Sequence, residues 1–280
     1  MRNLTSWLFE TGAVAAAPYD KPFFYTSGQI GPYYINTHYL YGGEQAANEL
    51  LALIDGMAGD RDNVAAAVTA ATVKHYEAGG VYKQLIDGMC EYINQNIGSD
   101  FDYISGGERR DWFFSLIIAR QLGKEHLTIF KDLEVRAAST GKKNAPLNGA
   151  SVLHISDIIT TASSYTRAWI PAIAAAGGRM AYSLSVLDRG QGGGAAIEDG
   201  GARSYSVAPI DKVLFDRALS DGYIDAGQHR MIVSYTENPD GYVRDFIADN
   251  PDFLQNALNS ADQKTAGRAR LLNDWLQTHR

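Results

Sequence analysis

Apolar segments typical of strands and of helices alternate along the middle of this chain, and this alternation constrains the fold more than any other feature. The run Phe101 to Ser105 predicts a short strand, and Arg110 to Leu122 has the apolar spacing of an amphipathic helix. His126 to Phe130 predicts the next strand. A strand, a helix and a strand in this order form a βαβ unit.

A second unit of the same kind follows the first. It has a strand over residues 151 to 155, a helix over 164 to 176 and a strand over Met180 to Leu187. Repeated βαβ units predict an α/β fold, in which helices flank a central parallel sheet. Ligands of such sheets bind at the carboxyl ends of the strands, so polar residues at these ends are the first candidates for a site.

The segments outside these units are mainly helical, apart from one aromatic stretch. Leu4 to Ala17 and Gly43 to Ile97 have helical patterns, and Gly79-Gly80 breaks the second of them. Pro22 to Tyr34 is aromatic and interrupted by turn residues, which predicts short strands that form an edge or a hood. Asp132 to Gly149 carries Gly, Pro, Asn and basic residues without apolar periodicity, which predicts a long mobile loop.

The C-terminal residues determine the expected domain division. From about residue 211 onward, helical stretches such as Val243 to Ile247 and Gly267 to Gln277 occur without a further strand and helix repeat. We therefore expect one domain over residues 1–210, which includes the hood and the helical insertion. Residues 211–280 are expected to form a helical C-terminal extension.

The composition limits the classes of protein to which the chain can belong. With 280 residues, of which 45% are hydrophobic, it can bury a sizeable core. The net charge of -7 argues against a protein whose whole surface binds nucleic acid. A single cysteine, Cys90, excludes an intrachain disulfide and a cysteine-based metal site, so a cytoplasmic protein is expected. No segment has the ~20 apolar residues that a spanning helix needs, and we expect neither secretion nor membrane insertion.

The segment Ser151 to Ser164 is the strongest single indication of function. A buried strand is followed by the carboxylate of Asp157, and a turn rich in hydroxyl groups then leads into a helix. Backbone N–H groups and hydroxyls converge in such a turn, and the helix start adds a positive dipole end, so the turn can bind phosphate. A carboxylate beside it can bind sugar hydroxyls. The candidate phosphate-binding residues are Thr160, Thr161, Ala162, Ser163 and Ser164.

Polar clusters also follow the other strands of the predicted sheet. The glycines among them permit a close approach of the backbone, and the basic side chains can bind anionic oxygens. Because the strands are expected to be parallel, all of these clusters should surround one crevice. They comprise Gly106, Gly107, Arg109 and Arg110 after the first strand, Lys131 with Arg136, Lys142 and Lys143 after the second, and Asp188 with Arg189 after the fourth.

Each motif also has a purely structural interpretation. The hydroxyl-rich turn is consistent with an ordinary helix N-cap. Glu108, Arg109 and Arg110 are consistent with a solvated group of ion pairs. His154 alternates within an apolar strand, so a core histidine is a simpler interpretation than a catalytic one. The convergence of four clusters on one edge of the sheet favours a binding site over these alternatives.

Three segments, taken together and in order, point to a known family. They are Phe24-Tyr25-Thr26-Ser27-Gly28 through Pro32-Tyr33-Tyr34-Ile35-Asn36, Val152 to Ser164, and Leu187-Asp188-Arg189-Gly190-Gln191-Gly192-Gly193. In these residues the chain resembles the orotate phosphoribosyltransferases of the type I phosphoribosyltransferase family. The resemblance implies a five-stranded parallel sheet with an N-terminal hood. It also implies transfer of ribose 5-phosphate between phosphoribosyl pyrophosphate and a nucleobase, orotate above all, with Mg²⁺ bound through phosphoribosyl pyrophosphate.

The resemblance also implies roles for individual residues. Asp157, Lys131 and Arg136 would take part in catalysis, and Arg189, Ser27 and Tyr33 would bind the base. No residue would bind the metal directly, and the partners would be the two substrates and a second copy of the chain in a homodimer, without nucleic acid or membrane. The residues that would bind phosphoribosyl pyrophosphate are Ser156, Asp157, Thr160, Thr161, Ala162, Ser163, Ser164, Gly106, Gly107 and Arg109.

Three departures from the family pattern support other hypotheses. Ser156 stands beside Asp157 where the family usually has a second acid, and Thr26 stands where these enzymes commonly carry a lysine. The loop after Phe130 lacks their basic signature that ends in histidine. These residues favour a non-catalytic regulatory protein that binds phosphoribosyl pyrophosphate or a nucleotide. A further hypothesis is an interaction protein whose helical extension binds a partner.

Overall fold

The computed structural model describes residues 3–143 and 146–278 of the chain. They group into two compact units. The first comprises Met1–Ala13 and Thr37–Ile210, and the second comprises Val14–Asn36 and Asp211–Arg280. The sequence-based division also placed a boundary near residue 210. It assigned Val14–Asn36 to the first domain, whereas the structure groups these residues with the C-terminal helices.

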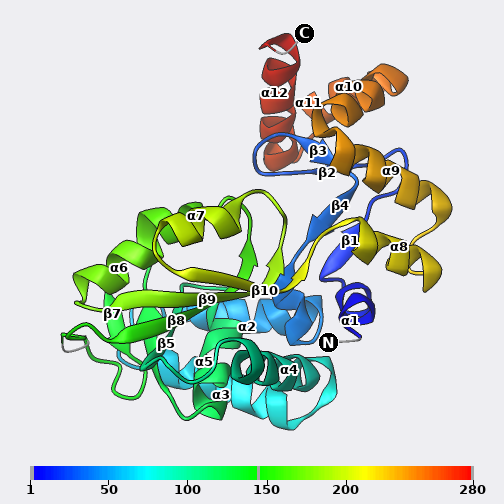
Figure 1. Ribbon diagram of the computed structural model, residues 1–280. Helices are drawn as coiled ribbons and strands as arrows, with labels where there is room; N and C mark the ends of the chain where they lie inside the picture. Colours follow the sequence, from blue (N-terminus) through cyan, green and yellow to red (C-terminus); the bar gives the residue numbers. More distant parts are fainter. Residues whose placement is uncertain (1–2, 144–145, 279–280) are drawn as a thin grey trace. The chain divides into compact units, whose positions relative to one another are not determined.

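Within the described residues, the first unit is built on a six-stranded sheet with the order β10-β9-β8-β5-β6-β7 (Figure 1). The strands from β10 to β6 are parallel, and β7 pairs antiparallel with β6 at one edge. Together with its helices, this sheet confirms the predicted α/β fold. The strands are β5 (Tyr103–Gly107), β6 (Glu125–Ile129), β7 (Val135–Ala137), β8 (Ser151–Ile159), β9 (Arg179–Asp188) and β10 (Arg203–Pro209).

Helices cover both faces of this sheet (Figure 1). On one face, α7 (Gly193–Asp199) lies beside α6 (Ile170–Ala175), which follows a π-helical turn, Tyr165–Trp169. The first unit also contains α1 (Leu4–Glu10) and a 3-10 helix, Thr37–Tyr41. The other face is covered by α2 (Glu44–Gly56), α3 (Val64–Glu77), α4 (Gly80–Asn96) and α5 (Trp112–Gln121).

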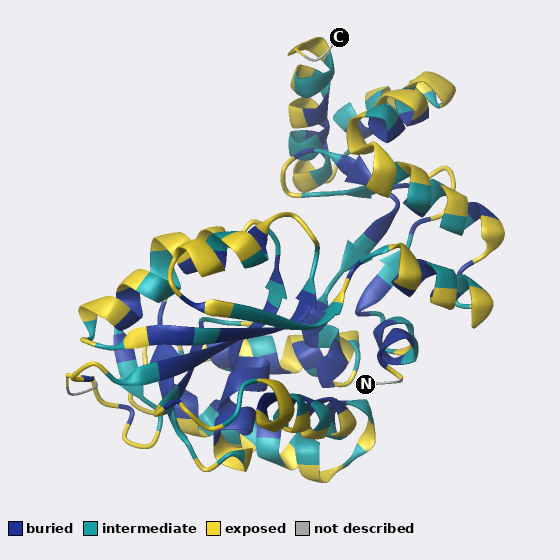
Figure 2. Cartoon of the chain, viewed as in Figure 1, coloured by how far each residue is buried: buried dark blue, intermediate teal, exposed yellow. Residues whose placement is uncertain are grey.

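The central strands and α5 form the buried interior of the first unit. β8 and β9 are buried along most of their length, as expected for parallel strands covered on both faces (Figure 2). Every residue of α5 from Trp112 to Ala119 is buried as well. The expectation of an amphipathic helix here is wrong, because α5 packs on β5, β6 and β8 on one side and on α3 and α4 on the other.

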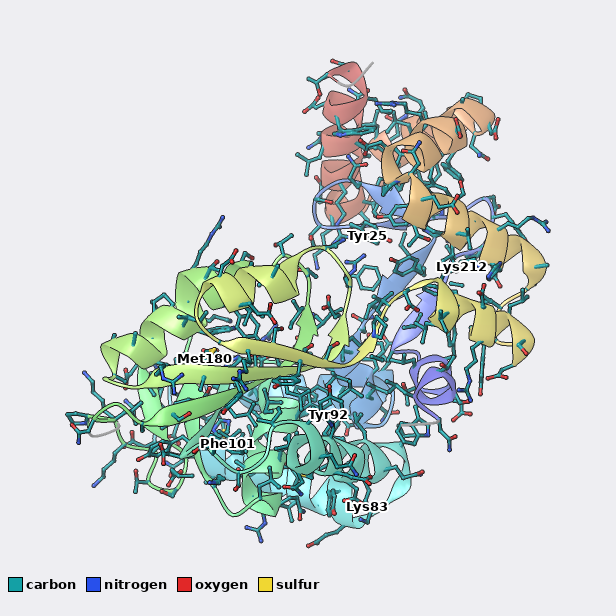
Figure 3. All side chains as sticks on the ribbon, viewed as in Figure 1. Tyr25, Lys83, Tyr92, Phe101, Met180 and Lys212 are labelled. Atoms are coloured by element: carbon teal, nitrogen blue, oxygen red, sulfur yellow. The ribbon has the colours of Figure 1, made fainter. Side chains whose placement is uncertain are left out.

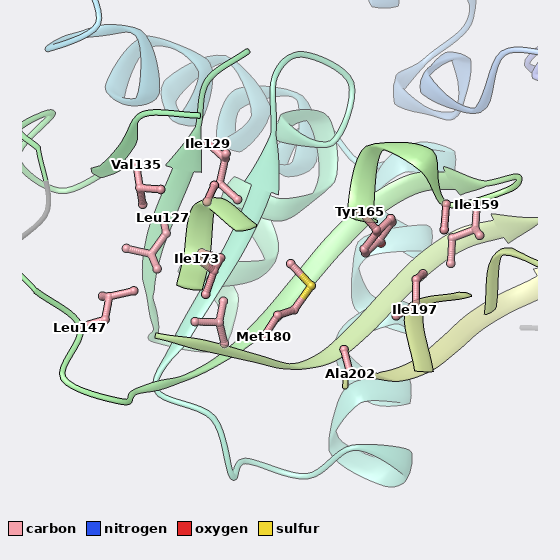
Figure 4. Close-up of a cluster of buried hydrophobic side chains, with 13 residues drawn as sticks. Leu127, Ile129, Val135, Leu147, Ile159, Tyr165, Ile173, Met180, Ile197 and Ala202 are labelled. Carbon is pink, nitrogen blue, oxygen red and sulfur yellow. The ribbon is translucent and has the colours of Figure 1, made fainter. Parts of the chain in front are cut away.

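A cluster of apolar side chains lies between the sheet and α6 (Figure 4). At one end of this cluster, Ile159 at the end of β8 lies near Tyr165 and Ile197, which come from the π-helical turn and α7. This packing supports the turn that follows β8. The cluster also contains Leu127, Ile129, Val135, Leu147, Val152, Ala162, Ala172, Ile173, Met180 and Ala202.

Two predicted segments differ from the structure. The helix expected over Leu4 to Ala17 ends at Glu10, and Val14–Ala16 forms β1, which pairs antiparallel with β4 (Tyr33–Ile35). Gly12 has a φ of 72°, which ends the helix, and the ladder with β4 then overrides the helix propensity of the alanines. Within the expected loop from Asp132 to Gly149, β7 extends the sheet because Val135 packs into the core. Residues 144 and 145 of that loop lie outside the described residues.

The second unit joins the aromatic N-terminal segment to C-terminal helices. β2 (Phe23–Phe24) and β3 (Ile30–Gly31) form a hairpin, which confirms the short strands expected over Pro22 to Tyr34. Tyr25, labelled in Figure 3, packs edge-on against Tyr235, with 6.3 Å between ring centroids. The aromatic residues therefore serve packing within this unit. Its helices are α8 (Lys212–Ser220), α9 (Ala226–Glu237), α10 (Pro239–Asp249), α11 (Pro251–Leu258) and α12 (Gln263–Thr278).

In the part of the chain that the structure describes, no helix has the length and apolar character needed to cross a membrane.

Candidate functional site

A pocket of about 340 Å³ opens in the first unit where β5, β6 and β8 end. This position, at the carboxyl ends of parallel strands, is the one that the fold class predicts for a ligand. Its volume lies within the range of small-molecule sites. The pocket is lined by Glu108, Arg109, Arg110, Asp111, Lys131, Ser156, Asp157, Ile158, Ile159, Thr160, Ala162, Ser163, Ser164, Tyr165 and Trp169.

Most of the site residues predicted from the sequence meet at this pocket. Those that line it are Arg109, Lys131, Ser156, Asp157, Thr160, Ala162, Ser163 and Ser164. The others do not line it, and they are Gly106, Gly107, Thr161, Arg136 and Arg189 in the first unit and Ser27 and Tyr33 in the second. Three separate strand ends thus contribute to one pocket, as the sheet topology predicts.

The hydroxyl-rich turn after β8 has a conformation fixed by two small residues. Ala162 has a φ of 56°, in the left-handed region that non-glycine residues seldom adopt. Gly193, at the start of α7, packs directly beneath the turn. A Cβ atom at Gly193 would lie 2.4 Å from the Thr160 carbonyl oxygen and 2.3 Å from Ile159 Cγ2. Only glycine therefore fits at this position without moving the turn.

Asp157 is the buried acid of the pocket, and it lies inside β8, where the sequence analysis had placed it after a shorter strand. Its carboxylate accepts a hydrogen bond from the Ile158 N–H at 2.7 Å. Burial and, to a smaller extent, the neighbouring Asp111 together raise the pKa of Asp157 to about 7, although Arg110 opposes the shift. A carboxyl group with this pKa changes its charge near neutral pH.

Asp111 is the principal functional candidate that the sequence analysis did not single out. Its carboxylate accepts the Gly107 N–H at 2.9 Å and the Asp157 N–H at 3.1 Å. His154 Nε2 lies 3.5 Å from the same carboxylate, and His154 Nδ1 lies 2.9 Å from Ser105 Oγ. His154 is fully buried, which confirms its interpretation as a core histidine. The signal available in the sequence was only an acid that follows two arginines.

The cationic side of the pocket is formed by the loop after β5 and the end of β6. Arg109 forms an ion pair with Asp55 on α2. The Lys131 N–H donates to Glu108 Oε2 at 3.1 Å, and Lys131 Nζ lies 3.7 Å from Glu108 Oε1. These ion pairs join Arg109 and Glu108 to Asp55 and Lys131, which lie outside the group that the structural interpretation expected. The same residues nevertheless place basic groups along the wall of the pocket.

Ser156 takes part in a chain of neutral hydroxyl groups. The Ser183 hydroxyl donates to the Tyr165 hydroxyl at 2.7 Å, and the Tyr165 hydroxyl donates to Ser156 Oγ at 2.7 Å. All three residues are buried, and burial raises the pKa of Tyr165 well above its usual value. Ser156 is therefore held by the protein's own hydroxyl groups.

Gly106 and Gly107 are closely packed inside the protein, and their binding of phosphoribosyl pyrophosphate stays a prediction. Both belong to β5, and the absence of a side chain permits the close approach of neighbouring residues. A Cβ atom at Gly106 would lie 2.2 Å from Ser115 Oγ, and one at Gly107 would lie 2.3 Å from the Trp169 ring.

Arg136 lies away from the pocket, on β7. Its guanidinium forms ion pairs with Asp62 and Glu134 and donates to the Gly141 carbonyl oxygen at 2.8 Å. The sequence analysis expected this arginine on a mobile loop, but the pairing of β7 with β6 and these ion pairs hold it at the edge of the sheet. In the structure, Arg136 therefore binds other residues of the protein at the edge of the sheet.

The three residues expected to bind a base are distributed over both units. Arg189 follows β9 in the first unit, and its N–H donates to the Ile159 carbonyl oxygen at 3.0 Å. In the second unit, Tyr33 is only 5% exposed, and its ring packs on Phe215 and Tyr235. Ser27 is exposed in the turn of the β2–β3 hairpin.

The sequence has detectable relatives, although no family model matches it. Over 138 residues it is 35% identical to an orotate phosphoribosyltransferase of Pyrobaculum islandicum, a match that covers 48% of this chain and 68% of that protein. Over 155 residues it is 28% identical to an orotate phosphoribosyltransferase of Sulfurisphaera tokodaii, covering 55% of this chain and 77% of that protein.

A solved structure with the same fold is an orotate phosphoribosyltransferase from Francisella tularensis. The two have a TM-score of 0.54 over 84% of this chain and 97% of that chain. Their sequence identity is 14%, so this similarity concerns the fold alone.

Proposed function

This chain belongs to the type I phosphoribosyltransferase family as an orotate phosphoribosyltransferase-like member, and from this premise we propose that it is an enzyme that uses orotate. The reaction transfers ribose 5-phosphate between phosphoribosyl pyrophosphate and the base. One observation carries the proposal. The buried acid Asp157, the hydroxyl-rich turn after it and the basic loop Glu108–Arg110 all line a single pocket.

Each wall of the pocket suits one part of phosphoribosyl pyrophosphate. The hydroxyls and backbone N–H groups of Thr160, Ser163 and Ser164 suit the 5-phosphate, because such groups bind anionic oxygens. Asp157 lies just before the turn and suits the ribose hydroxyls. Arg109 and Lys131, which also line the pocket, suit the pyrophosphate.

The chemistry of the reaction requires this distribution of charge. When the bond to pyrophosphate breaks, positive charge develops on the sugar and negative charge on the leaving group. Basic side chains fixed beside the leaving group stabilise that transition state. A carboxylate near the ribose stabilises the positive charge that develops on the sugar. Asp157 provides such a carboxylate in its deprotonated form.

Mg²⁺ fits this site as a companion of the substrate. Among the described residues, no group of three or more His, Cys, Asp or Glu side chains is arranged to hold a metal ion. Mg²⁺ commonly binds through substrate phosphates with few protein ligands. We therefore propose that it enters with phosphoribosyl pyrophosphate, where it would neutralise charge on the leaving group.

A pyrophosphate-release assay tests the proposal. Protein, phosphoribosyl pyrophosphate and Mg²⁺ are mixed with orotate, uracil, adenine or hypoxanthine, with a reaction without base as the control for hydrolysis. We expect release above the control, and the fastest release with orotate. An absence of release with every base contradicts the catalytic proposal, and release with another base alone contradicts the assignment of orotate.

A non-catalytic binding protein is the second candidate, and the engagement of Ser156 by Tyr165 favours it. In this case the pocket would keep its phosphate-binding turn without the second acid of the family pattern at that position. Calorimetry with phosphoribosyl pyrophosphate separates the candidates, because binding without any product supports the second one. Absence of binding excludes both.

We also propose a homodimer, which sedimentation of the full chain tests directly.

A further inference from the structure

The pairing between β5 and β8 stops before either strand ends. Their ladder runs from Tyr103 opposite Val152 to Ser105 opposite His154. Beyond this point β5 continues beside β6, and β8 continues beside β9. The backbone N–H groups of Gly107 and Asp157 therefore lie where these two strands no longer bond to each other.

Asp111 bridges the gap that the two strands leave. Oδ2 accepts the Gly107 N–H at 2.9 Å, and Oδ1 accepts the Asp157 N–H at 3.1 Å. The Asp111 side chain is 10% exposed, so both hydrogen bonds are shielded from solvent. Hydrogen bonds to an ionised acceptor are stronger than those between neutral groups. One carboxylate thus joins the strand that carries Asp157 to the strand that leads into the basic loop.

The charged and titratable groups around this bridge come from three elements. Arg110 precedes Asp111 and opposes the rise in the pKa of Asp157. His154 on β8 lies 3.5 Å from the Asp111 carboxylate, and its Nε2 has no hydrogen-bond partner among the described residues. Tyr165 on the π-helical turn interacts electrostatically with Asp111 and Asp157. The two acids therefore share one buried environment.

We propose that Asp111 is a positioning residue that holds Asp157 in place and supplies the second negative charge beside it, which Ser156 does not supply. In the sequence, the acid next to Asp157 is missing. In the structure, a carboxylate reaches Asp157 from the start of α5 instead. The effect of this arrangement on turnover rests on the proposed function, whereas its effect on Asp157 itself does not.

The chain offers a matched control for this proposal. Asp102 lies just before β5, and its Oδ2 accepts the Ser151 N–H at 2.8 Å at the opposite end of the same two strands. Asp102 is exposed and does not line the pocket. Asp111→Asn and Asp102→Asn each replace one carboxylate that joins β5 to β8, but only the first removes a charge beside Asp157.

The decisive experiment is an NMR titration of the side-chain carboxyl of Asp157 without substrate, assigned with Asp157→Asn. We expect Asp157 to titrate near pH 7 in the wild type. It should titrate about one pH unit lower or more in Asp111→Asn, because a neighbouring like charge is lost. In Asp102→Asn the titration should match the wild type. Turnover should fall about a hundredfold in Asp111→Asn alone, since misplacement of a reacting group is that costly.

An unchanged titration of Asp157 in Asp111→Asn overturns the proposal, as does an equal shift in Asp102→Asn. If the wild type has no turnover, the proposed function fails while the titration still decides the role of Asp111. Asp111→Glu provides a second test should Asp111→Asn not fold. It keeps the charge and moves the carboxylate, so the amide signals of Gly107 and Asp157 should shift while Asp157 still titrates near neutral pH. Unmoved amide signals overturn the proposal.

Discussion

The end of β8 holds buried polar groups in two different ways. Ser156 takes part in a neutral chain, in which hydroxyl groups of Ser183 and Tyr165 satisfy one another. The next residue, Asp157, lies beside a second carboxylate, that of Asp111. Adjacent residues of a strand direct their side chains to opposite faces, so neighbouring positions have such different environments.

The difference shows how one strand end can combine a fixed geometry with a titratable charge. A satisfied chain of hydroxyl groups costs little to bury and keeps its charge state from acidic to mildly alkaline pH. Two carboxylates in a buried place repel each other, so one of them retains a proton at a higher pH than usual. The chain of hydroxyl groups at Ser156 therefore keeps a fixed geometry. The pair of carboxylates at Asp157 is the one suited to respond to a ligand.

The largest expected effect comes from Asp157→Asn. The variant keeps the shape of the side chain but loses the negative charge beside the proposed ribose site, so kcat should fall about a hundredfold. The pyrophosphate-release assay measures this change, and thermal melting should show a fold at least as stable as the wild type. Asp102→Asn is the control, with unchanged turnover expected. A variant Asp157→Asn with wild-type turnover would contradict the assigned role of this acid.

The pH dependence of stability distinguishes the carboxylates at Asp157 from the neutral hydroxyl chain at Ser156. The pKa of Asp157 is about 7 in the folded protein against 3.8 as its ordinary value. The folded state thus keeps a proton that the unfolded state has lost, so this group's contribution to stability declines as pH rises toward and through 7. Asn does not titrate. The unfolding free energy of Asp157→Asn relative to the wild type should therefore increase by about 1 kcal/mol or more from pH 5 to pH 8. Urea denaturation at both pH values measures it, and a constant difference would contradict the prediction.

Removing the Tyr165 hydroxyl tests the neutral side. Tyr165→Phe leaves Ser156 and Ser183 without their shared partner and should lower the unfolding free energy by about 1–3 kcal/mol. This loss should be the same at pH 5 and pH 8, because tyrosine remains neutral in both states over this range. Urea denaturation again provides the measurement, with Ser183→Ala as a milder companion. A loss that varies with pH between 5 and 8 would contradict this prediction.

The smallest effect is expected at Ala162, in the turn that joins β8 to the π-helical turn before α6. Ala162→Gly relieves the left-handed conformation and should raise the unfolding free energy by no more than about 1 kcal/mol. Ala172→Gly, inside α6, is the control and should destabilise the protein. Equal destabilisation by both variants would show that the conformation of Ala162 carries no strain. Neither variant should alter the titration of Asp157.

The parts of the site that could be predicted from the sequence are local. The apolar run before Ser156 indicates a buried strand, and the hydroxyl-rich residues from Thr160 to Ser164 indicate a turn before a helix. Both features depend on neighbours in the chain. The parallel sheet then follows from the order of the elements, and it brings Arg109 and Lys131 to the same pocket.

Features that depend on pairing between distant segments could not be predicted in this way. The role of Asp111 follows from the place where the β5–β8 ladder stops, at Ser105 opposite His154, and no local pattern indicates that place. Val14–Ala16 has the composition of a helix and becomes a strand only because β4 is available to pair. In the sequence, Arg136 looks like a basic residue of a loop. Its ion pairs with Asp62 and Glu134 are visible only in the structure.

The enclosure of α5 has a consequence for the dynamics of the site. A helix with packed side chains on every side cannot separate from the sheet without disrupting the surrounding core. Its amide protons should therefore exchange with solvent only through the highest-energy openings of this unit. Asp111 lies at the start of that helix. The carboxylate beside Asp157 should thus keep its position during local openings that free the surrounding loops.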